Sequence, residues 1–155
     1  MRYSPTILTI AFMLLVPIAI AAQGVTATPK TARPTNAVTV QSSSPAYAEV
    51  LLRKTELESD LESFLTEYTD DYPKVKRSRY ELDLISKEAD RLLAIKPSEA
   101  AKLSEALGKL IVRKVELQGD LWAVQQQFGD AHPDVKRAKR KVEIYEKAIK
   151  EILGS

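Results

Sequence analysis

The most constraining feature of this sequence is a stretch that occurs twice, at an offset of 60 residues and without a gap. An ungapped repeat of this size indicates one supersecondary unit used twice. Eleven identities fall in one register, which in the first copy are Arg53, Lys54, Glu56, Leu57, Asp60, Leu61, Asp70, Pro73, Val75, Lys76 and Arg77. The two copies should therefore fold in the same way.

Both copies show the pattern of amphipathic helices, because their apolar residues recur at alternating spacings of three and four. Pro73 and Pro133 follow short polar turns and suit the first turn of a new helix. Ser98 is expected to cap the third helix. We predict an all-α fold of four antiparallel helices, arranged as two repeated, coiled-coil-like helical hairpins at residues 46–95 and 98–153.

The N-terminal residues have the features of a secretory signal peptide. An apolar run of about 15 residues follows Arg2 and ends in a small-residue site, so cleavage is expected after Ala21 or Ala22. This predicts a signal peptide at 1–21 and a periplasmic or secreted bacterial protein. The alternative is an uncleaved anchor in the inner membrane that faces the periplasm, although the run is shorter than the ~20 residues of a spanning helix.

The next segment, residues 22–45, is rich in Thr, Ser, Pro and Ala and has few large apolar side chains. Such a segment cannot bury enough surface to offset the entropy of ordering it. We therefore expect a disordered linker between the export signal and the folded part.

The composition argues against several functional classes. There is no cysteine, so disulfides and thiolate metal sites are excluded. His132 is the single histidine, and 23 Lys and Arg against 21 Asp and Glu do not indicate a nucleic-acid-binding protein. No phosphate-binding glycine loop, nucleophile elbow or metal-ligand motif is present. We expect no enzymatic activity, catalytic residue, metal or cofactor.

Two lysines, Lys54 and Lys114, interrupt the apolar stripes at equivalent places. Each could extend along the edge of its stripe with the ammonium group in water. Alternatively, each could be a polar core position that fixes the register of the helices. Leu121, in the stripe of the third helix, is expected to lie in the core if that stripe is buried.

A cluster of cations follows each of the two prolines. These residues are Lys76, Arg77 and Arg79 in the first copy and Lys136, Arg137, Lys139, Arg140 and Lys141 in the second. They could form a solvated face that is paired internally, or a surface that binds an anionic partner. If the helices run up and down in turn, both clusters lie at one end of the bundle.

The turn from Phe128 to Val135 resembles a motif in the periplasmic coiled-coil region of bacterial polysaccharide chain-length determinants, the exopolysaccharide copolymerases. That family has an aromatic residue, a few polar residues and then His-Pro-x-Val at the start of a helix. The segment from Tyr68 to Val75 is similar, with Tyr72 in place of the histidine. The resemblance covers these turns and their flanking helices, and it implies an exported helical hairpin on the envelope side.

These observations lead to an expected function in binding. We expect a non-enzymatic cell-envelope scaffold or assembly factor, with a protein partner or self-association, and with an anionic envelope polymer or lipid surface as a further candidate partner. The alternatives are a periplasmic holdase-type chaperone and a membrane-anchored coiled-coil partner of a polysaccharide export system.

Overall fold

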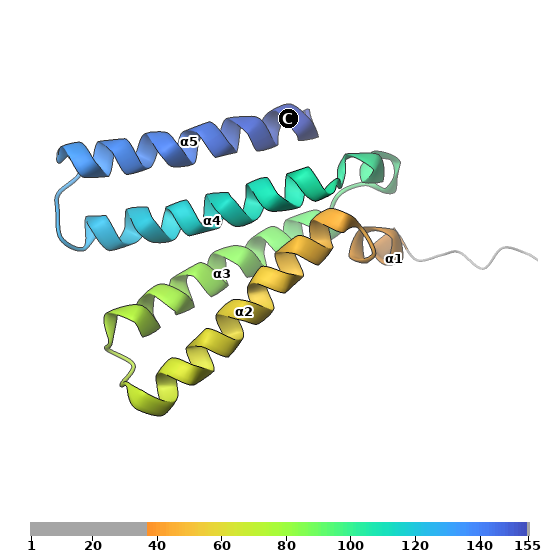
Figure 1. The fold of residues 1–155 in the computed structure, drawn as a ribbon. Helices are drawn as coiled ribbons and strands as arrows, with labels where there is room; N and C mark the ends of the chain where they lie inside the picture. Colours follow the sequence, from red (N-terminus) through yellow and green to blue (C-terminus); the bar gives the residue numbers. More distant parts are fainter. Residues whose placement is uncertain (1–36, 155) are drawn as a thin grey trace, which may run out of the picture. The chain divides into compact units, whose positions relative to one another are not determined.

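The computed structural model describes residues 37–154, which form helices and no strand (Figure 1). The predicted all-α class is confirmed for these residues. The predicted signal peptide and the first part of the predicted linker lie outside them. The helical segments are α1 (Ala37–Ser42), α2 (Pro45–Glu67), α3 (Pro73–Leu93), the 3-10 helix η1 (Pro97–Lys102), α4 (Glu105–Gln125) and α5 (Pro133–Leu153).

Local sequence signals explain where these helices begin and end. A proline occupies the first turn of α2, α3, η1 and α5, where its missing N–H is not needed. The hydroxyls of Ser44 and Ser104 accept hydrogen bonds from the backbone N–H groups of Tyr47 (3.2 Å) and Leu107 (3.3 Å), which caps α2 and α4. Gly154 ends α5 with φ of 75°, a conformation that favours glycine.

The structure differs from the sequence-based expectation at two boundaries. Residues 37–42, expected to be linker, form α1, which is fixed by a 2.6 Å hydrogen bond from Gln41 Nε2 to the carbonyl oxygen of Ile95. The third long helix begins at Glu105 rather than after Ser98, because Pro97–Lys102 forms a separate 3-10 turn and Ser104 is the cap.

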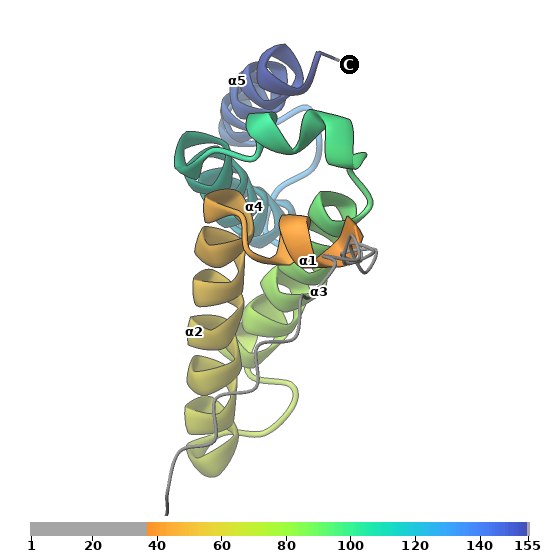
Figure 2. The ribbon, with the colours of Figure 1, turned by 90° about the vertical axis from the view of Figure 1, so that its right-hand side faces the viewer.

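The helix α4 is central to the described part of the chain. It packs against α2 and α3 on one side and against α5 on the other (Figures 1 and 2). The buried core comes from α2, α3, α4, α5 and the end of η1, and its residues are Ala46, Val50, Leu57, Ile85, Ala89, Leu92, Leu103, Leu107, Ile111, Val115 and Ile149. Two faces of α4 are therefore covered.

Because α4 has neighbours on two sides, its core residues extend beyond the single apolar stripe predicted from the sequence, and some residues of that stripe are only half-buried. Leu107, Ile111 and Val115 are almost fully buried, whereas Leu121 is half-buried. A helix that contacts neighbours on two sides buries a wider band of residues than a stripe of three-and-four spacing contains.

The helix boundaries recur at the offset of the sequence repeat. The helices α3 and α5 share both bounds at this offset, α2 and α4 share their first residue, and α1 and η1 share both bounds. The correspondence thus extends to residues 37–52, which carry little of the sequence identity. We call residues 37–93 unit 1 and residues 97–153 unit 2.

Candidate binding surfaces

The turns between α2 and α3 and between α4 and α5 are closed by equivalent contacts. Tyr68 stacks on Tyr72 with 4.0 Å between ring centroids, and Phe128 stacks on His132 at 4.1 Å. His132 also caps α5, because its Nδ1 accepts a 3.2 Å hydrogen bond from the N–H of Asp134. The aromatic-to-histidine motif is thus explained by local structure.

An ion pair spans nine residues across each turn. Arg79 pairs with Asp70 at 2.6 Å, and Lys139 pairs with Asp130 at 3.0 Å. Hydrogen bonds from Lys139 and Gln125 hold the pKa of the Asp130 carboxyl below its ordinary value. Two of the eight predicted partner-binding cations therefore bind to their own turns.

The other two cations of the first cluster also have carboxylate partners. Lys76 pairs with Asp71 at 2.8 Å, and this hydrogen bond lowers the pKa of the Asp71 carboxyl. Arg77 donates hydrogen bonds of 2.7 Å to both Glu81 and Asp120, which links α3 to α4. Burial of Arg77 opposes its charged form, but these hydrogen bonds outweigh burial and raise its pKa. The first cluster is thus neutralised within the chain.

The second cluster is different, because most of its charge is not neutralised. Arg137 is 70% exposed and has only a 3.4 Å contact with the exposed Asp134. Lys136, Arg140 and Lys141 are exposed and form no ion pair with any carboxylate of residues 37–154. In Figure 1 the two turns lie on the same side of the drawing, at the opposite ends of the long helices from α1.

The carboxylate of Glu81 neutralises Arg77 of the first cluster. Its side chain is 4% exposed and accepts hydrogen bonds from Arg53 (3.3 Å) and Arg77 (2.7 Å). It lies against Gly119 of α4, where a Cβ atom would come within 2.1 Å of Oε1. Unit 2 has Lys141 at the position equivalent to Glu81. The equivalent group of side chains in unit 2 therefore lacks the central carboxylate.

A groove runs between α4 and α5, and we call it the α4/α5 groove. Part of it, with a volume of about 260 Å³, is lined by Arg113, Leu117, Lys141, Ile144 and Tyr145. A second hollow of about 220 Å³ shares Leu117 and Lys141 and adds Arg137 together with Asp120 and Asp134, which pair with Arg77 and Arg137. Ile144 is 65% exposed. The groove therefore combines an exposed apolar side chain with Lys141, a cation that has no carboxylate partner among residues 37–154.

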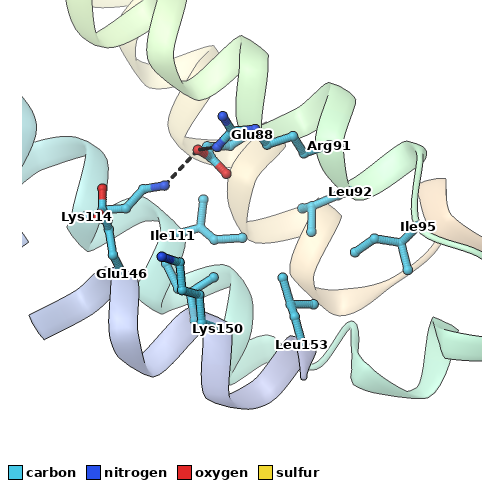
Figure 3. Close-up of a pocket in the computed structure, with 10 residues that line it drawn as sticks. Glu88, Arg91, Leu92, Ile95, Ile111, Lys114, Glu146, Lys150 and Leu153 are labelled. Atoms are coloured by element: carbon cyan, nitrogen blue, oxygen red, sulfur yellow. Dashed lines mark hydrogen bonds and ion pairs between the residues drawn. The ribbon is translucent and has the colours of Figure 1, made fainter. Parts of the chain in front are cut away.

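A larger groove of about 380 Å³ lies between α3, α4 and α5 (Figure 3). Leu92, Ile111 and Leu153 contribute aliphatic surface to it. The Glu88 carboxylate accepts hydrogen bonds from Lys114 (2.7 Å) and Arg91 (2.6 Å). The acid and the bases of α3 and α4 thus satisfy each other, and the groove offers mainly apolar contact.

The same ion pair distinguishes the two interpretations of the stripe lysines. The Lys114 side chain is 7% exposed and is paired with Glu88, so it is a polar core position. The Lys54 side chain is 35% exposed and contacts Glu58 at 3.8 Å, as expected of a lysine at the edge of a stripe. The two equivalent lysines therefore have different environments.

Residues 37–154 contain no cluster of His, Cys, Asp and Glu side chains that could hold a metal ion. Within the same range, no helix has the length and apolar character needed to cross a membrane. No known protein family, curated protein or solved structure matches this chain. Its surfaces are therefore interpreted from their own geometry.

The α4/α5 groove was not predicted from the sequence, although two of its residues, Arg137 and Lys141, were predicted to bind a partner. The signal that could have revealed it is the set of positions where the two copies differ. Glu81 and Glu88 have Lys141 and Ala148 as counterparts, so the acids that neutralise α3 are missing from α5.

Proposed function

We propose that this chain is a non-enzymatic, exported scaffold protein of the bacterial cell envelope, built from two tandem helical hairpins, that binds an acidic protein surface. The single observation that carries the binding role is the α4/α5 groove, in which Lys141 lies beside the exposed Ile144 and Arg137 lines the adjoining hollow. The apolar N-terminal segment and the turn motif support the envelope setting.

The composition of the groove favours a protein partner over a small substrate. Cations that lack internal partners attract acidic groups and accelerate association with them. Burying the exposed aliphatic surface of Ile144 would add roughly 25 cal/mol for each Å² removed from water. A helix with acidic and apolar residues side by side satisfies both requirements.

Binding of poly-L-glutamate to the full-length chain at low ionic strength tests this proposal. The double variant Arg137→Gln, Lys141→Gln should bind at least about tenfold more weakly, because each lost charge pair contributes to affinity. Lys147→Gln is the control, since Lys147 lines neither hollow of the groove. Equal binding by the wild type and the double variant would overturn the proposal.

Two further arms separate the other candidate roles. Stronger binding to phosphatidylglycerol vesicles than to poly-L-glutamate would indicate a lipid surface as the partner. Suppression of aggregation of an unfolded protein at equimolar amounts would indicate a holdase-type chaperone instead of a scaffold.

A further inference from the structure

We propose that the α4/α5 groove binds helix α2 of a second copy of this chain, so that copies associate head to tail. The inference rests on the tandem arrangement proposed above and names the partner of the same groove. Its template is the contact within the chain, where α4 docks against the pair formed by α2 and α3. By the repeat, the counterpart of α4 is α2, and the counterparts of α2 and α3 are α4 and α5.

The contact within the chain is well defined. Asp120 of α4 pairs with Arg77 at 2.7 Å, and the ring of Trp122 stacks on Tyr80 with 5.6 Å between ring centroids. Further along, Gly119 lies against Glu81. These α4 residues together form what we call the docking face.

The docking face has an exposed counterpart on α2. Ile111 of α4 is 2% exposed, whereas the equivalent Leu51 of α2 is 45% exposed. Val112 packs against the core, whereas the equivalent Leu52 is 58% exposed. Two adjacent leucines thus lie in solvent at the places where α4 makes buried contacts.

The charges at the equivalent positions are complementary. Asp60 and Arg137 have the same residue types as Asp120 and Arg77, so this ion pair can form again between copies. The stacked pair Trp122 and Tyr80 is replaced by Glu62 and Arg140, which have opposite charges. A partner of the required acidic and apolar character is therefore present on the chain itself.

The position of Lys141 agrees with this arrangement. Its counterpart Glu81 lies against Gly119, and the equivalent of Gly119 is Ser59. Ser59 is flanked by Glu58 and Asp60 on α2. The lysine of one copy would thus face acids of the next copy, which supply the carboxylate that Lys141 lacks within its own chain.

One difference between α4 and α2 at equivalent positions should make the contact between copies looser than the contact within the chain. A Cβ atom on Gly108 would lie 2.8 Å from the carbonyl oxygen of Ala46. The equivalent residue of α2 is Ala48, which has that Cβ atom. The two helices must therefore stand further apart there, and the association should be reversible.

Head-to-tail contact uses two different surfaces of one chain, so it leaves one of each free at the ends of every assembly. Such a heterologous interface generates open chains of subunits or closed rings, whereas a two-fold symmetric interface stops at a dimer. The mass should therefore rise beyond that of a dimer as the protein concentration increases.

Sedimentation velocity on the full-length chain at low ionic strength tests the proposal with two charge-reversal variants. The first, Asp60→Arg with Glu62→Arg, alters the face of α2. The second, Arg137→Glu with Arg140→Glu, alters Arg137 of the α4/α5 groove and the exposed Arg140 on the same helix. The wild type should form assemblies larger than dimers, and each variant alone should raise the dissociation constant at least about tenfold.

Mixing the two variants gives the decisive result. The altered, basic face of α2 in the first variant is complementary to the altered, acidic α5 surface of the second variant. The unaltered α2 of the second variant and the unaltered groove of the first variant keep their native, complementary charges. The mixture should therefore regain assembly, which a folding defect in either variant could not produce. Lys147→Glu should assemble like the wild type, because its counterpart Lys87 is exposed and forms its ion pair with Asp83 of its own helix.

A wild type that stays monomeric, stops at a dimer, or assembles equally well with either variant would overturn the inference. The last outcome would place the association at a surface other than α2 and the α4/α5 groove. Failure of assembly with normal binding of poly-L-glutamate would reject the second copy as partner and leave the proposed function standing. Failure of both would reject both.

Discussion

The ammonium group of Lys114 on α4 donates a 2.7 Å hydrogen bond to the carboxylate of Glu88 on α3, and both side chains are at most 10% exposed. This buried ion pair joins unit 1 to unit 2. Its energetic importance lies in the cost of breaking it, since a buried charge without its partner is strongly unfavourable.

Replacing Glu88→Ala should lower the free energy of unfolding by about 3–5 kcal/mol, because Lys114 would remain buried without a carboxylate. Urea denaturation measures the change. Glu58→Ala is the matched control: it removes the acid beside the partly exposed Lys54 and should cost less than about 0.5 kcal/mol. Equal effects of the two substitutions would contradict a buried role for Lys114.

Replacing Gly108→Ala should destabilise the contact between α2 and α4. The added Cβ atom would meet backbone atoms of Ala46 at 2.8 and 2.9 Å, and the backbone cannot rotate away as a side chain can. We expect a net loss of roughly 1–3 kcal/mol from overpacking, even after the better helix propensity of alanine. Gly129→Ala, which meets nothing within 4 Å, should change stability by less than about 0.5 kcal/mol in the same assay.

Leu107→Ala should cost about 2–5 kcal/mol, since Leu107 is 0% exposed and its truncation leaves a cavity in the core. The companion substitution Ile144→Ala removes an apolar side chain that is 65% exposed, so a monomer should lose less than about 0.5 kcal/mol. Thermal unfolding of dilute protein would show the contrast. A small effect at Leu107 would mean that this face of α4 is not the core.

The titration of Asp130 reports whether the ion pair across the second turn forms in solution. Hydrogen bonds from Lys139 and Gln125 lower its pKa, so this interaction is fully present above the ordinary carboxyl pKa and is lost as the pH falls through the lowered value. An NMR titration should place Asp130 below an unperturbed aspartate. In Lys139→Gln its midpoint should rise towards the ordinary value, and an unchanged midpoint would argue that Lys139 makes no such contact.

The helical class was predictable because periodicity and proline placement act locally. Pro73 and Pro133 open α3 and α5 where the pattern predicted. The start of the third long helix was not predictable in this way, because Ser98 and Ser104 are both plausible caps. Ser98 lies inside the 3-10 turn Pro97–Lys102, and this turn leaves Ser104 as the residue that caps α4.

The candidate cations could be listed from the sequence, but their pairing could not. Arg77 is not free to bind a partner, because it donates a hydrogen bond to Asp120. This aspartate lies 43 residues away in the sequence and is brought close by the docking of α4. Lys141 is free to bind a partner because it stands where unit 1 has the acid Glu81. Long-range packing therefore decided that Arg77 is paired, whereas its equivalent Arg137 contacts only the exposed Asp134.

The nine-residue span of the ion pairs across the two turns also bears on the order of folding events. Contacts that close short loops form quickly, whereas contacts between distant segments form after a larger loss of chain entropy. Each unit should therefore condense around its own turn before α4 docks on α2. Val135→Ala, at a buried site beside the second turn, should mainly slow refolding, and Gly108→Ala should mainly speed unfolding. Stopped-flow kinetics with the reverse assignment would place the docking of the two units first.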